Sequence, residues 1–153
     1  PEAMLLSKEV IIELHLTGYK IKRYIASMLR QQGVPLTPEQ FMLIDLLWNE
    51  GEMTQQQLAN QLKKDKNSVT MLVDAIESKG LVGRRQNTLD RRSNTVVLTD
   101  KALELKEMAK QKGISILDGM LEGISEDELH SFLNTLRLLN QNMTVLEEDT
   151  EAV

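Results

Sequence analysis

Residues 66–99 read KNSVTMLVDAIESKGLVGRRQNTLDRRSNTVVLT, and this stretch decides the fold. Its first half predicts an amphipathic helix, because four apolar residues recur at i, i+3, i+4 and i+7: Val69, Leu72, Val73 and Ile76. Two short β-type runs follow, Leu81–Arg85 and Thr95–Leu98, and the polar loop between them suits a hairpin turn. A helix of this kind fits the major groove of DNA, and a basic hairpin beside it can reach the adjacent minor groove.

The positive charge of the chain is concentrated around this stretch. The whole molecule carries a net charge of −5, but residues 54–98 hold eight Lys/Arg and four Asp/Glu, a net charge of +4. The parts before and after carry −2 and −7. Such a distribution concentrates phosphate affinity on one face, while the acidic remainder repels DNA. The alternative is that the charged helix and hairpin are simply solvated, and charge alone does not decide between the two.

Composition narrows the class of protein. At 153 residues the chain predicts one domain, or one compact unit with appended helices. The absence of cysteine excludes disulfides, thiolate metal sites and a cysteine-based redox sensor. No apolar run approaches the roughly 18–20 residues of a membrane span, and the start, at Pro1 rather than Met, lacks the pattern of a signal peptide. We expect a soluble, cytoplasmic protein with no membrane partner.

Helix-start signals organise the residues before the deciding stretch. Thr37–Gln40 and Thr54–Gln57 each form a capping-box pattern, and Asp65 can cap the helix that follows. Gly80 is placed to end that helix. Two short helices joined by a few residues, the second with a polar outer face, predict a helix-turn-helix, and the hairpin forms its wing.

Long helices are expected on both sides of this core. Residues 7–31 carry apolar residues in alternating steps of three and four, which predicts a narrow seam for a partner helix. After Thr99 a helix can run to about Leu121, with Gly113 as a weak point. A capping box at Ser125 opens a last helix, and the acidic tail, residues 147–153, is expected to fray.

In this order the segments resemble the MarR family of winged-helix transcription regulators. The resemblance is carried by LTPEQ at 36–40, QQQLANQL at 55–62, NSVTMLVDAIESKGLVGR at 67–84 and DRRSNTVVLT at 90–99, the last pattern being the most specific. The close match covers about 65 residues. One departure, Ala102 where the family usually has a glycine, lies at a helix start and puts little in doubt, because alanine is a good helix former.

The resemblance implies a mainly α fold with a small β wing. Residues 36–99 form the winged helix-turn-helix, residues 1–35 an N-terminal dimerisation helix and residues 100–153 C-terminal dimerisation helices. It also implies an obligate homodimer, and the surplus of apolar positions in the terminal helices calls for one independently. A two-fold dimer sets its recognition helices, here about residues 66–79, roughly 34–36 Å apart, so the expected partner is double-stranded DNA with a pseudopalindromic operator.

The outward residues of the recognition helix are candidates for reading bases. Asparagine can bond adenine bidentately, lysine reaches a guanine or a phosphate, and methionine touches a thymine methyl or packs at the helix edge. The alternative for the small polar residues is a local cap. The candidate base readers are Lys66, Asn67, Ser68, Thr70 and Met71, and the candidate phosphate contacts are Thr54, Gln55, Gln56, Lys63 and Lys64.

The wing, about residues 82–98, carries the other DNA candidates. They are Arg84, Arg85, Asp90, Arg91 and Arg92. Arg91 is the candidate for a narrow, A·T-rich minor groove, whose negative potential favours arginine. Arg92 resembles the family arginine that pairs with an aspartate to shape the hairpin, with Asp90 nearest and Asp65 as the alternative. The sequence leaves open which arginine inserts.

The resemblance further implies a crevice for a small aromatic or anionic effector between the dimer helices and the winged helix. Tyr19, Arg23, Tyr24 and Trp48 can supply an aromatic wall and a cation, although they fit core and surface positions equally well. We expect no cofactor and no metal. His15 and His130 lie on the expected dimer helices, but neither has a second histidine at helical spacing, and the chain has no cysteine.

Two other classes of protein fit the sequence less well. A winged helix used only to bind another protein has no need for base-reading side chains such as Asn67 and Thr70. An enzyme needs a Ser/His/Asp or Cys/His set, a glycine-rich phosphate loop or a paired-carboxylate motif, and the sequence shows none of these. The sequence therefore predicts a DNA-binding transcriptional regulator, with repression favoured over activation, and not an enzyme.

Overall fold

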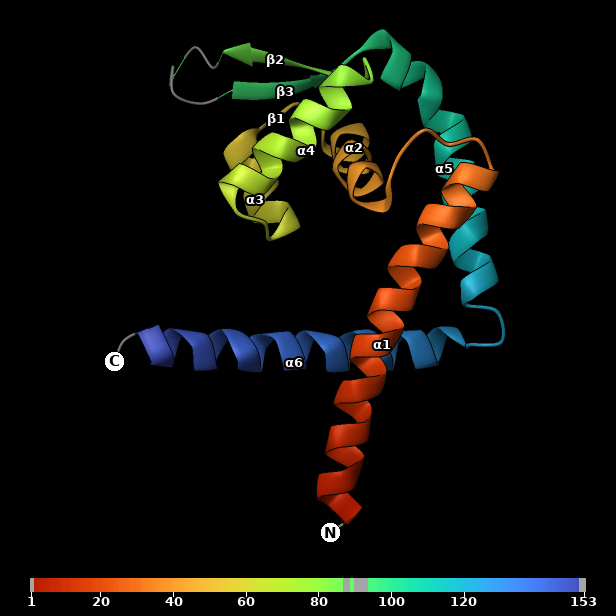
Figure 1. Ribbon diagram of the computed structural model, residues 1–153, viewed down its shortest axis with the longest axis vertical. Coiled ribbons are helices and arrows are strands. Elements are labelled where there is room, and N and C mark those ends of the chain that lie inside the picture. The colour runs from red at the N-terminus through yellow and green to blue at the C-terminus, as the bar shows by residue number, and fades with distance from the viewer. Residues whose placement is uncertain (1, 87–88, 90–93, 152–153) are drawn as a thin grey trace. The chain divides into compact units, whose positions relative to one another are not determined.

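The computed structural model, shown in Figure 1, describes residues 2–86, 89 and 94–151. Within these residues the elements are, in chain order, α1 (Glu2–Gln31), α2 (Pro38–Glu50), β1 (Met53–Thr54), α3 (Gln55–Leu62), α4 (Lys66–Ser78), β2 (Val82–Gln86), β3 (Asn94–Leu98), α5 (Asp100–Met120) and α6 (Glu126–Glu151). The chain divides into two compact units, one up to Ile116 and one from Leu117 onward, so α5 contributes to both. The expected fold, mainly helical with a small β wing, is confirmed.

The helix-turn-helix surrounds an aliphatic core. The side chains at its centre are completely buried, and they are Leu43 and Ile44 of α2, Leu58 of α3, Val69, Val73 and Ile76 of α4, and Val96 of β3. The helical spacing read from the sequence therefore identifies the inner face of α4, although Leu72 is only half-buried. Burying a side chain of this size contributes about 1.5–3 kcal/mol, so this core fixes how α4 sits on α2 and α3.

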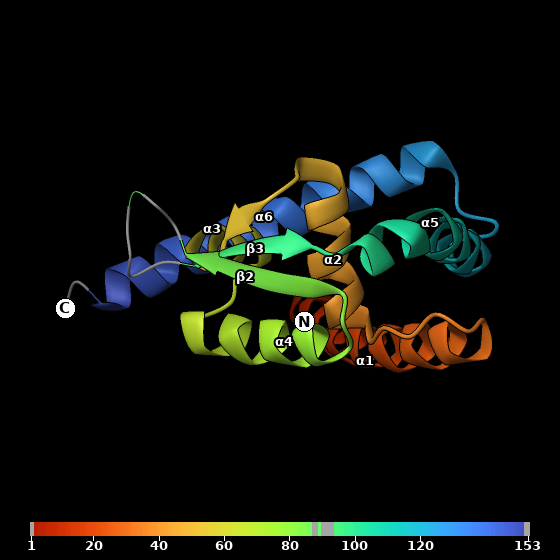
Figure 2. The ribbon, with the colours of Figure 1, turned by 90° about the horizontal axis from the view of Figure 1, so that it is seen from above.

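The wing belongs to a three-stranded antiparallel sheet in the order β1-β3-β2. Figure 2 shows β2 and β3 running side by side, with β3 between β2 and β1. Val96 of β3 is paired with Met53 on one side and with Arg84 on the other. The sequence predicted β2 and β3 to within one residue but missed β1, because two residues before a helix show no alternation that could be detected.

The helix starts predicted from capping patterns in this unit are confirmed. Thr37 Oγ1 accepts the backbone N–H of Gln40 at 3.2 Å, and Gln40 Oε1 accepts the backbone N–H of Thr37 at 3.1 Å. Thr54 and Gln57 exchange the same pair of bonds at 3.1 and 2.9 Å. Each box satisfies two N–H groups that have no partner within the helix.

Helix α5 packs against α2 through aromatic side chains. Trp48 Nε1 donates to the carbonyl oxygen of Ala102 at 3.1 Å, and the Phe41 ring stands edge-on to Trp48 with the ring centres 6.0 Å apart. Gly113 faces the same ring: a Cβ there would lie 3.0 Å from Phe41 Cζ. The expected weak point at Gly113 therefore does not interrupt α5, and the glycine instead allows the close approach of Phe41.

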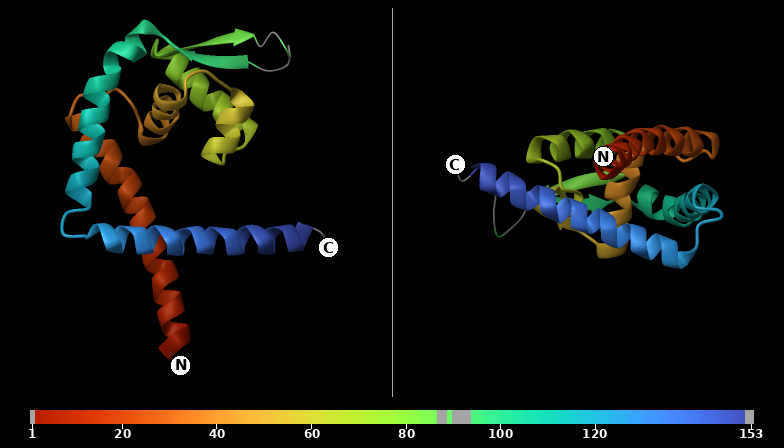
Figure 3. Two further views of the ribbon diagram at one scale, coloured as in Figure 1. Left: turned by 180° about the vertical axis from the view of Figure 1, so that it is seen from behind. Right: turned by 90° about the horizontal axis from the view of Figure 1, so that it is seen from below.

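The terminal helices α1 and α6 are each one unbroken helix (Figure 3). Ser125 and Glu128 form the predicted capping box of α6, with bonds of 3.1 and 3.2 Å. The expectation that residues 147–153 fray is wrong for residues 147–151, because α6 continues to Glu151. Glutamate is a good helix former, so an acidic tail is well solvated without losing its helix. Among the described helices none has the length and apolar character needed to cross a membrane.

Asp65 caps the start of α4, as predicted. Its Oδ1 accepts the backbone N–H of Ser68 at 2.7 Å, and its Oδ2 accepts the Ser68 hydroxyl at 3.0 Å. Both bonds favour the charged carboxylate and hold the pKa of Asp65 below its ordinary value of 3.8. The positive end of the α4 dipole favours a negative charge at the same place.

Replacing Asp65 by alanine should lower the free energy of unfolding at pH 7, because the first turn of α4 loses its cap. A depressed pKa in the folded state means that the contribution is complete above pH 3.8 and is lost as the pH falls through the lower folded value. Urea unfolding curves of wild type and Asp65→Ala should therefore differ at pH 7 and converge in acid.

Asp65→Asn is the matched control, since asparagine caps a helix as well as aspartate but does not titrate. Its stability should exceed that of Asp65→Ala at every pH. A wild-type advantage over Asp65→Ala that persists unchanged at the lowest pH of folding contradicts a carboxylate cap.

Candidate nucleic-acid interface

The first two turns of α4 present a polar face to solvent. Lys66, Asn67 and Ser68 are exposed, and Met71, one turn further on, is 73 % exposed. Burial of the opposite face forces these side chains outward. Ser68 is bonded to Asp65, so the local cap left open by the sequence exists there. The Asn67 amide has no side-chain partner among the residues that the structure describes, and it is available to a ligand.

Thr70 and Gln55 are engaged inside the protein. Thr70 Oγ1 donates to the carbonyl oxygen of Lys66 at 3.0 Å and accepts from Gln55 Nε2, also at 3.0 Å. Gln55 is buried at the start of α3, and its Oε1 accepts from Arg84 Nε at 2.9 Å. The Gln55 side chain is therefore not presented to a phosphate, contrary to the sequence expectation, because hydrogen bonds within the protein hold it inside.

Arg84 of β2 is also turned toward the protein. Its Nη2 donates to Asp74 Oδ1 at 2.6 Å and its Nη1 to Glu77 Oε1 at 3.0 Å, and its side chain is only 19 % exposed. Arg85, the next residue, lies on the other face of the strand and pairs with Glu52 at 2.5 Å. The expected wing residues Asp90, Arg91 and Arg92 lie outside the described residues.

The other expected phosphate contacts lie at the start of α3, where Thr54 caps the helix, and in the turn between α3 and α4. Gln56 and Lys63 are exposed, and Lys63 ends α3 in a left-handed conformation with φ of 54°. Lys64 Nζ lies 3.5 Å from Glu39 Oε2, and Lys22 of α1 lies 3.4 Å from the other oxygen of that carboxylate. Partial burial of Glu39 raises its pKa, but the two lysines together outweigh this and hold the pKa below its usual range.

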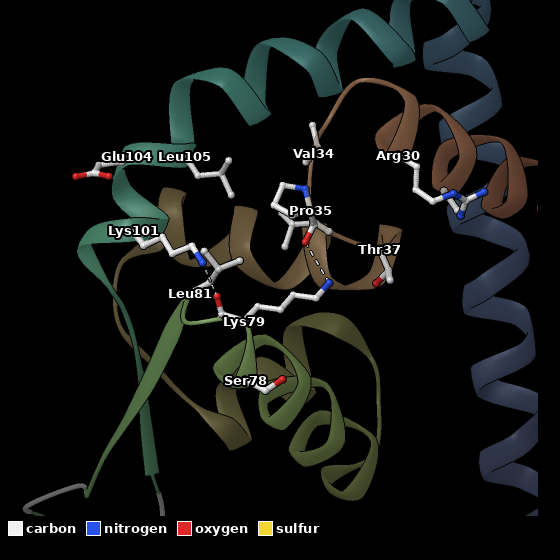
Figure 4. Close-up of a pocket in the computed structure, with 12 residues that line it drawn as sticks. Arg30, Val34, Pro35, Thr37, Ser78, Lys79, Leu81, Lys101, Glu104 and Leu105 are labelled. Atoms are coloured by element: carbon white, nitrogen blue, oxygen red, sulfur yellow. Dashed lines mark hydrogen bonds between the residues drawn. The ribbon is translucent and has the colours of Figure 1, made fainter.

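The C-terminal end of α4 is fixed by two lysines that the sequence did not single out. Lys79 Nζ donates to Gln40 Oε1 at 2.6 Å and to the carbonyl oxygen of Pro35 at 3.1 Å. Lys101 Nζ donates to the carbonyl oxygen of Lys79 at 2.9 Å, as Figure 4 shows. No local pattern points to these bonds, because Gln40 lies 39 residues from Lys79.

An open cavity of about 850 Å³ lies beside this end of α4 (Figure 4). The ends of α1 and α4, the segment between α1 and α2, and the start of α5 line it. Its apolar lining residues are Ala26, Val34, Pro35, Leu36, Leu81 and Leu105, and its charged ones are Arg30, Lys79, Lys101 and Glu104. The cavity therefore combines apolar walls with three cations and one carboxylate.

The four residues expected at an effector site do not line this cavity. Trp48 is buried against Phe41 and bonded to Ala102, so it is a core residue, which is the alternative that the sequence left open. Tyr19 and Arg23 lie together on α1, with the guanidinium carbon 5.0 Å from the ring centre. Tyr24 is exposed.

Comparisons with known proteins agree with this geometry. A family model described as the MarR family matches residues 36–94. The organic hydroperoxide resistance transcriptional regulator of Bacillus subtilis (strain 168) is 32% identical over 103 residues, which cover 66% of this chain and 69% of that protein. YdgJ, an HTH-type transcriptional regulator of the same organism, is 30% identical over 105 residues, which cover 69% of this chain and 64% of YdgJ. The chain thus matches slightly less than two thirds of YdgJ.

Solved structures share the fold over most of the chain. A variant of MarR from E. coli complexed with operator DNA has a TM-score of 0.77 at 23% identity, covering 86% of this chain and 93% of that one. The organohalide-sensing regulator RdhR, in its 2,4-dichlorophenol-bound form, has a TM-score of 0.78 at 21% identity, covering 90% and 80%. These two matches show the fold alone. The family model and the relative that is 32% identical over 69% of its own length establish that the chain is a member of the MarR family of winged helix-turn-helix transcriptional regulators, and not an enzyme.

Proposed function

We propose that the chain is a homodimeric, sequence-specific repressor in the cytoplasm that inserts α4 into the major groove of its operator and sets the wing, residues 82–98, at the adjacent minor groove. This proposal rests on one observation: α4 has one buried apolar face and one exposed polar face. Its inner face is completely buried at Val69, Val73 and Ile76, and its outer face offers Lys66, Asn67 and Met71 to solvent. A helix fixed in this way can present the same side chains to every copy of a site.

Each outward side chain of α4 has a distinct role in this proposal. Asn67 bonds an adenine edge, Lys66 reaches a guanine or a phosphate, and Met71 contacts a thymine methyl group. Ser68 and Thr70 take part through the hydroxyl capacity that their internal bonds leave free. This division assigns most of the base discrimination to the residue whose amide has no partner among the described residues, Asn67.

Contacts to phosphates orient the helix without reading sequence. We assign them to the start of α3 and to the turn before α4, where the side chains with polar or cationic groups near the surface are Thr54, Gln56, Lys63 and Lys64. In the wing, Arg85 is exposed and Arg91 is the proposed minor-groove residue. We propose that Arg92 shapes the hairpin by pairing with an aspartate, with Asp90 nearest in the sequence and Asp65 as the alternative.

The homodimer is supported by the apolar surface that the terminal helices leave uncovered. Helix α6 buries none of its residues, and α1 buries only Leu29. The large exposed side chains include Met4, Leu5, Leu6, Ile11, Ile12 and Leu16 on α1, and Phe132, Leu133, Leu138, Met143, Val145 and Leu146 on α6. Apolar surface of this extent is rare on a soluble monomer, and a second copy supplies helices of the same kind to cover it.

A small-molecule effector is proposed for the cavity beside the end of α4. Apolar walls suit an aromatic ring, and the cations of Arg30, Lys79 and Lys101 suit an anionic group. RdhR, a protein of this fold, has a 2,4-dichlorophenol-bound form, which supports the same class of ligand. A ligand that prefers one spacing of the two recognition helices shifts the equilibrium toward that spacing, and so releases DNA.

The DNA-binding proposal is tested with a duplex enriched by the wild-type protein from a random-sequence pool and with a scrambled duplex of equal length. Asn67→Ala should weaken binding of the selected duplex about 5- to 150-fold for each subunit, which corresponds to the ~1–3 kcal/mol of one bidentate base contact, and the two losses multiply because a homodimer carries two copies of Asn67. Binding of the scrambled duplex should change little, because no phosphate contact is removed. Fluorescence anisotropy measures both affinities.

Asn134→Ala, which removes an exposed asparagine of α6, is the matched control and should bind both duplexes like wild type. Enrichment of no sequence by the wild-type protein contradicts the proposed function. An equal loss on both duplexes for Asn67→Ala contradicts base reading by Asn67.

The effector proposal is tested with benzoate, a simple aromatic carboxylate, added to the complex with the selected duplex. Benzoate should weaken DNA binding by wild type, and Arg30→Met should abolish this response while leaving DNA binding intact, because Arg30 lines the cavity. Arg23→Met is the matched control on the same helix: it keeps the response if the cavity is the site, and loses it if the residues around Tyr19 hold the effector. No response by wild type excludes benzoate as an effector.

A further inference from the structure

Arg84 joins three elements of the winged helix-turn-helix through one guanidinium group. Its Nε donates to Gln55 Oε1 of α3 at 2.9 Å, and its two terminal nitrogens bond Asp74 and Glu77 of α4 at 2.6 and 3.0 Å. A longer bond of 3.3 Å reaches the carbonyl oxygen of Thr70. Arg84 itself stands on β2, opposite Val96 of β3. We call Arg84 and these four partners the Arg84 network.

We infer that Arg84 is a positioning residue for DNA recognition: it touches no nucleotide but fixes α4 against the wing and against α3, and so sets the orientation of the base-reading side chains. This inference rests on the proposed function. Two properties of the Arg84 network support the inference: its geometry and its charge.

The geometry connects β2 to the first turn of α4. Arg84 holds Gln55, Gln55 Nε2 donates to Thr70 Oγ1, and Thr70 Oγ1 donates to the carbonyl oxygen of Lys66. The chain of hydrogen bonds therefore ends at the residue that precedes Asn67. Gln55 is only 8 % exposed, so little solvent reaches its amide to replace a lost partner.

Arginine is the side chain that this arrangement requires. A guanidinium carries five N–H donors in a rigid plane and can address Gln55, Asp74 and Glu77 at once. The single ammonium of a lysine keeps the charge but cannot span all three directions. The identity of residue 84 is therefore tested separately from its charge.

The charge of the Arg84 network matters because α4 carries two carboxylates on a helix proposed to approach phosphates. The ionised residues of α4 are Lys66, Asp74 and Glu77, a net charge of −1 that Arg84 brings to zero. Asp74 and Glu77 are exposed, so without Arg84 they would face solvent and any polyanion there. Arg84 offsets one of these two negative charges in place, which reduces the repulsion between this part of α4 and DNA.

The test compares Arg84→Met, Arg84→Lys and the triple variant Arg84→Met, Asp74→Asn, Glu77→Gln in the full-length protein. Affinities for the selected and the scrambled duplex are measured at several salt concentrations. Arg85→Met is the matched control, because Arg85 is the next residue, is exposed and has a single carboxylate partner. Thermal unfolding of every variant is recorded in parallel.

Both single variants at position 84 should lower the affinity for the selected duplex at least tenfold. The ratio of the affinity for the selected duplex to the affinity for the scrambled duplex should also fall. The slope of log affinity against log salt should stay that of wild type, because no phosphate contact is lost. The triple variant should raise affinity for the scrambled duplex to the wild-type value or above it, because it carries one negative charge fewer than wild type at these positions, but it should not restore the ratio, because the bonds of Arg84 remain lost. Arg85→Met should keep the wild-type ratio even if it lowers both affinities, because a contact between Arg85 and the DNA backbone would contribute equally on the two duplexes.

Several results would overturn the inference. A slope reduced by about 0.9 per subunit makes Arg84 a phosphate contact. The geometric role is contradicted if Arg84→Lys discriminates between the selected and the scrambled duplex as well as wild type, or if Arg84→Met binds DNA like wild type. If the position-84 variants fail to fold, Arg84 is a requirement of the fold and not a positioning residue. Failure of the wild-type protein to select any duplex is a different outcome, since it removes the proposed function itself.

Discussion

Burial of one face of α4 is the constraint on which the rest of this protein depends. Val69, Val73 and Ile76 have no exposed surface, so α4 cannot turn about its axis without moving aliphatic groups into water, at a cost of about 25 cal/mol per Å². That constraint decides which side chains face outward. Polar bonds then hold the same helix from its exposed side: Asp65 at its start, Arg84 along its length and Lys79 at its end. A surface that discriminates between bases needs this rigidity.

The terminal helices, in contrast, leave their apolar surface uncovered. In the winged helix-turn-helix the apolar faces cover one another, whereas α6 buries none of its residues. The charge distribution follows the same division, because the basic excess lies in residues 54–98 and the acidic excess outside them. The exposed apolar helices and the basic core are thus separate parts of one chain, which supports the proposed dimer with its basic side toward DNA.

The sequence predicted what is local and missed what joins distant residues. Capping boxes were found because Thr54 and Gln57 are three residues apart, and the inner face of α4 because its spacing is periodic. Gln55 and Arg84, 29 residues apart, were assigned to DNA because nothing near either indicates that they meet. Trp48 was considered for an effector site for the same reason, since Ala102, its partner, lies 54 residues away. In each case the residue type suggested a role at the surface, whereas the structure shows that tertiary contacts hold the side chain within the protein.

The central claim is that two copies of the chain place their α4 helices on one side of a single duplex. Hydroxyl-radical footprinting of the wild-type protein on its selected duplex tests this most directly. The account predicts two protected tracts related by two-fold symmetry, with centres about 10–10.5 base pairs apart, one turn of the double helix. A single tract with no symmetry mate, at protein concentrations that saturate the duplex, would contradict it.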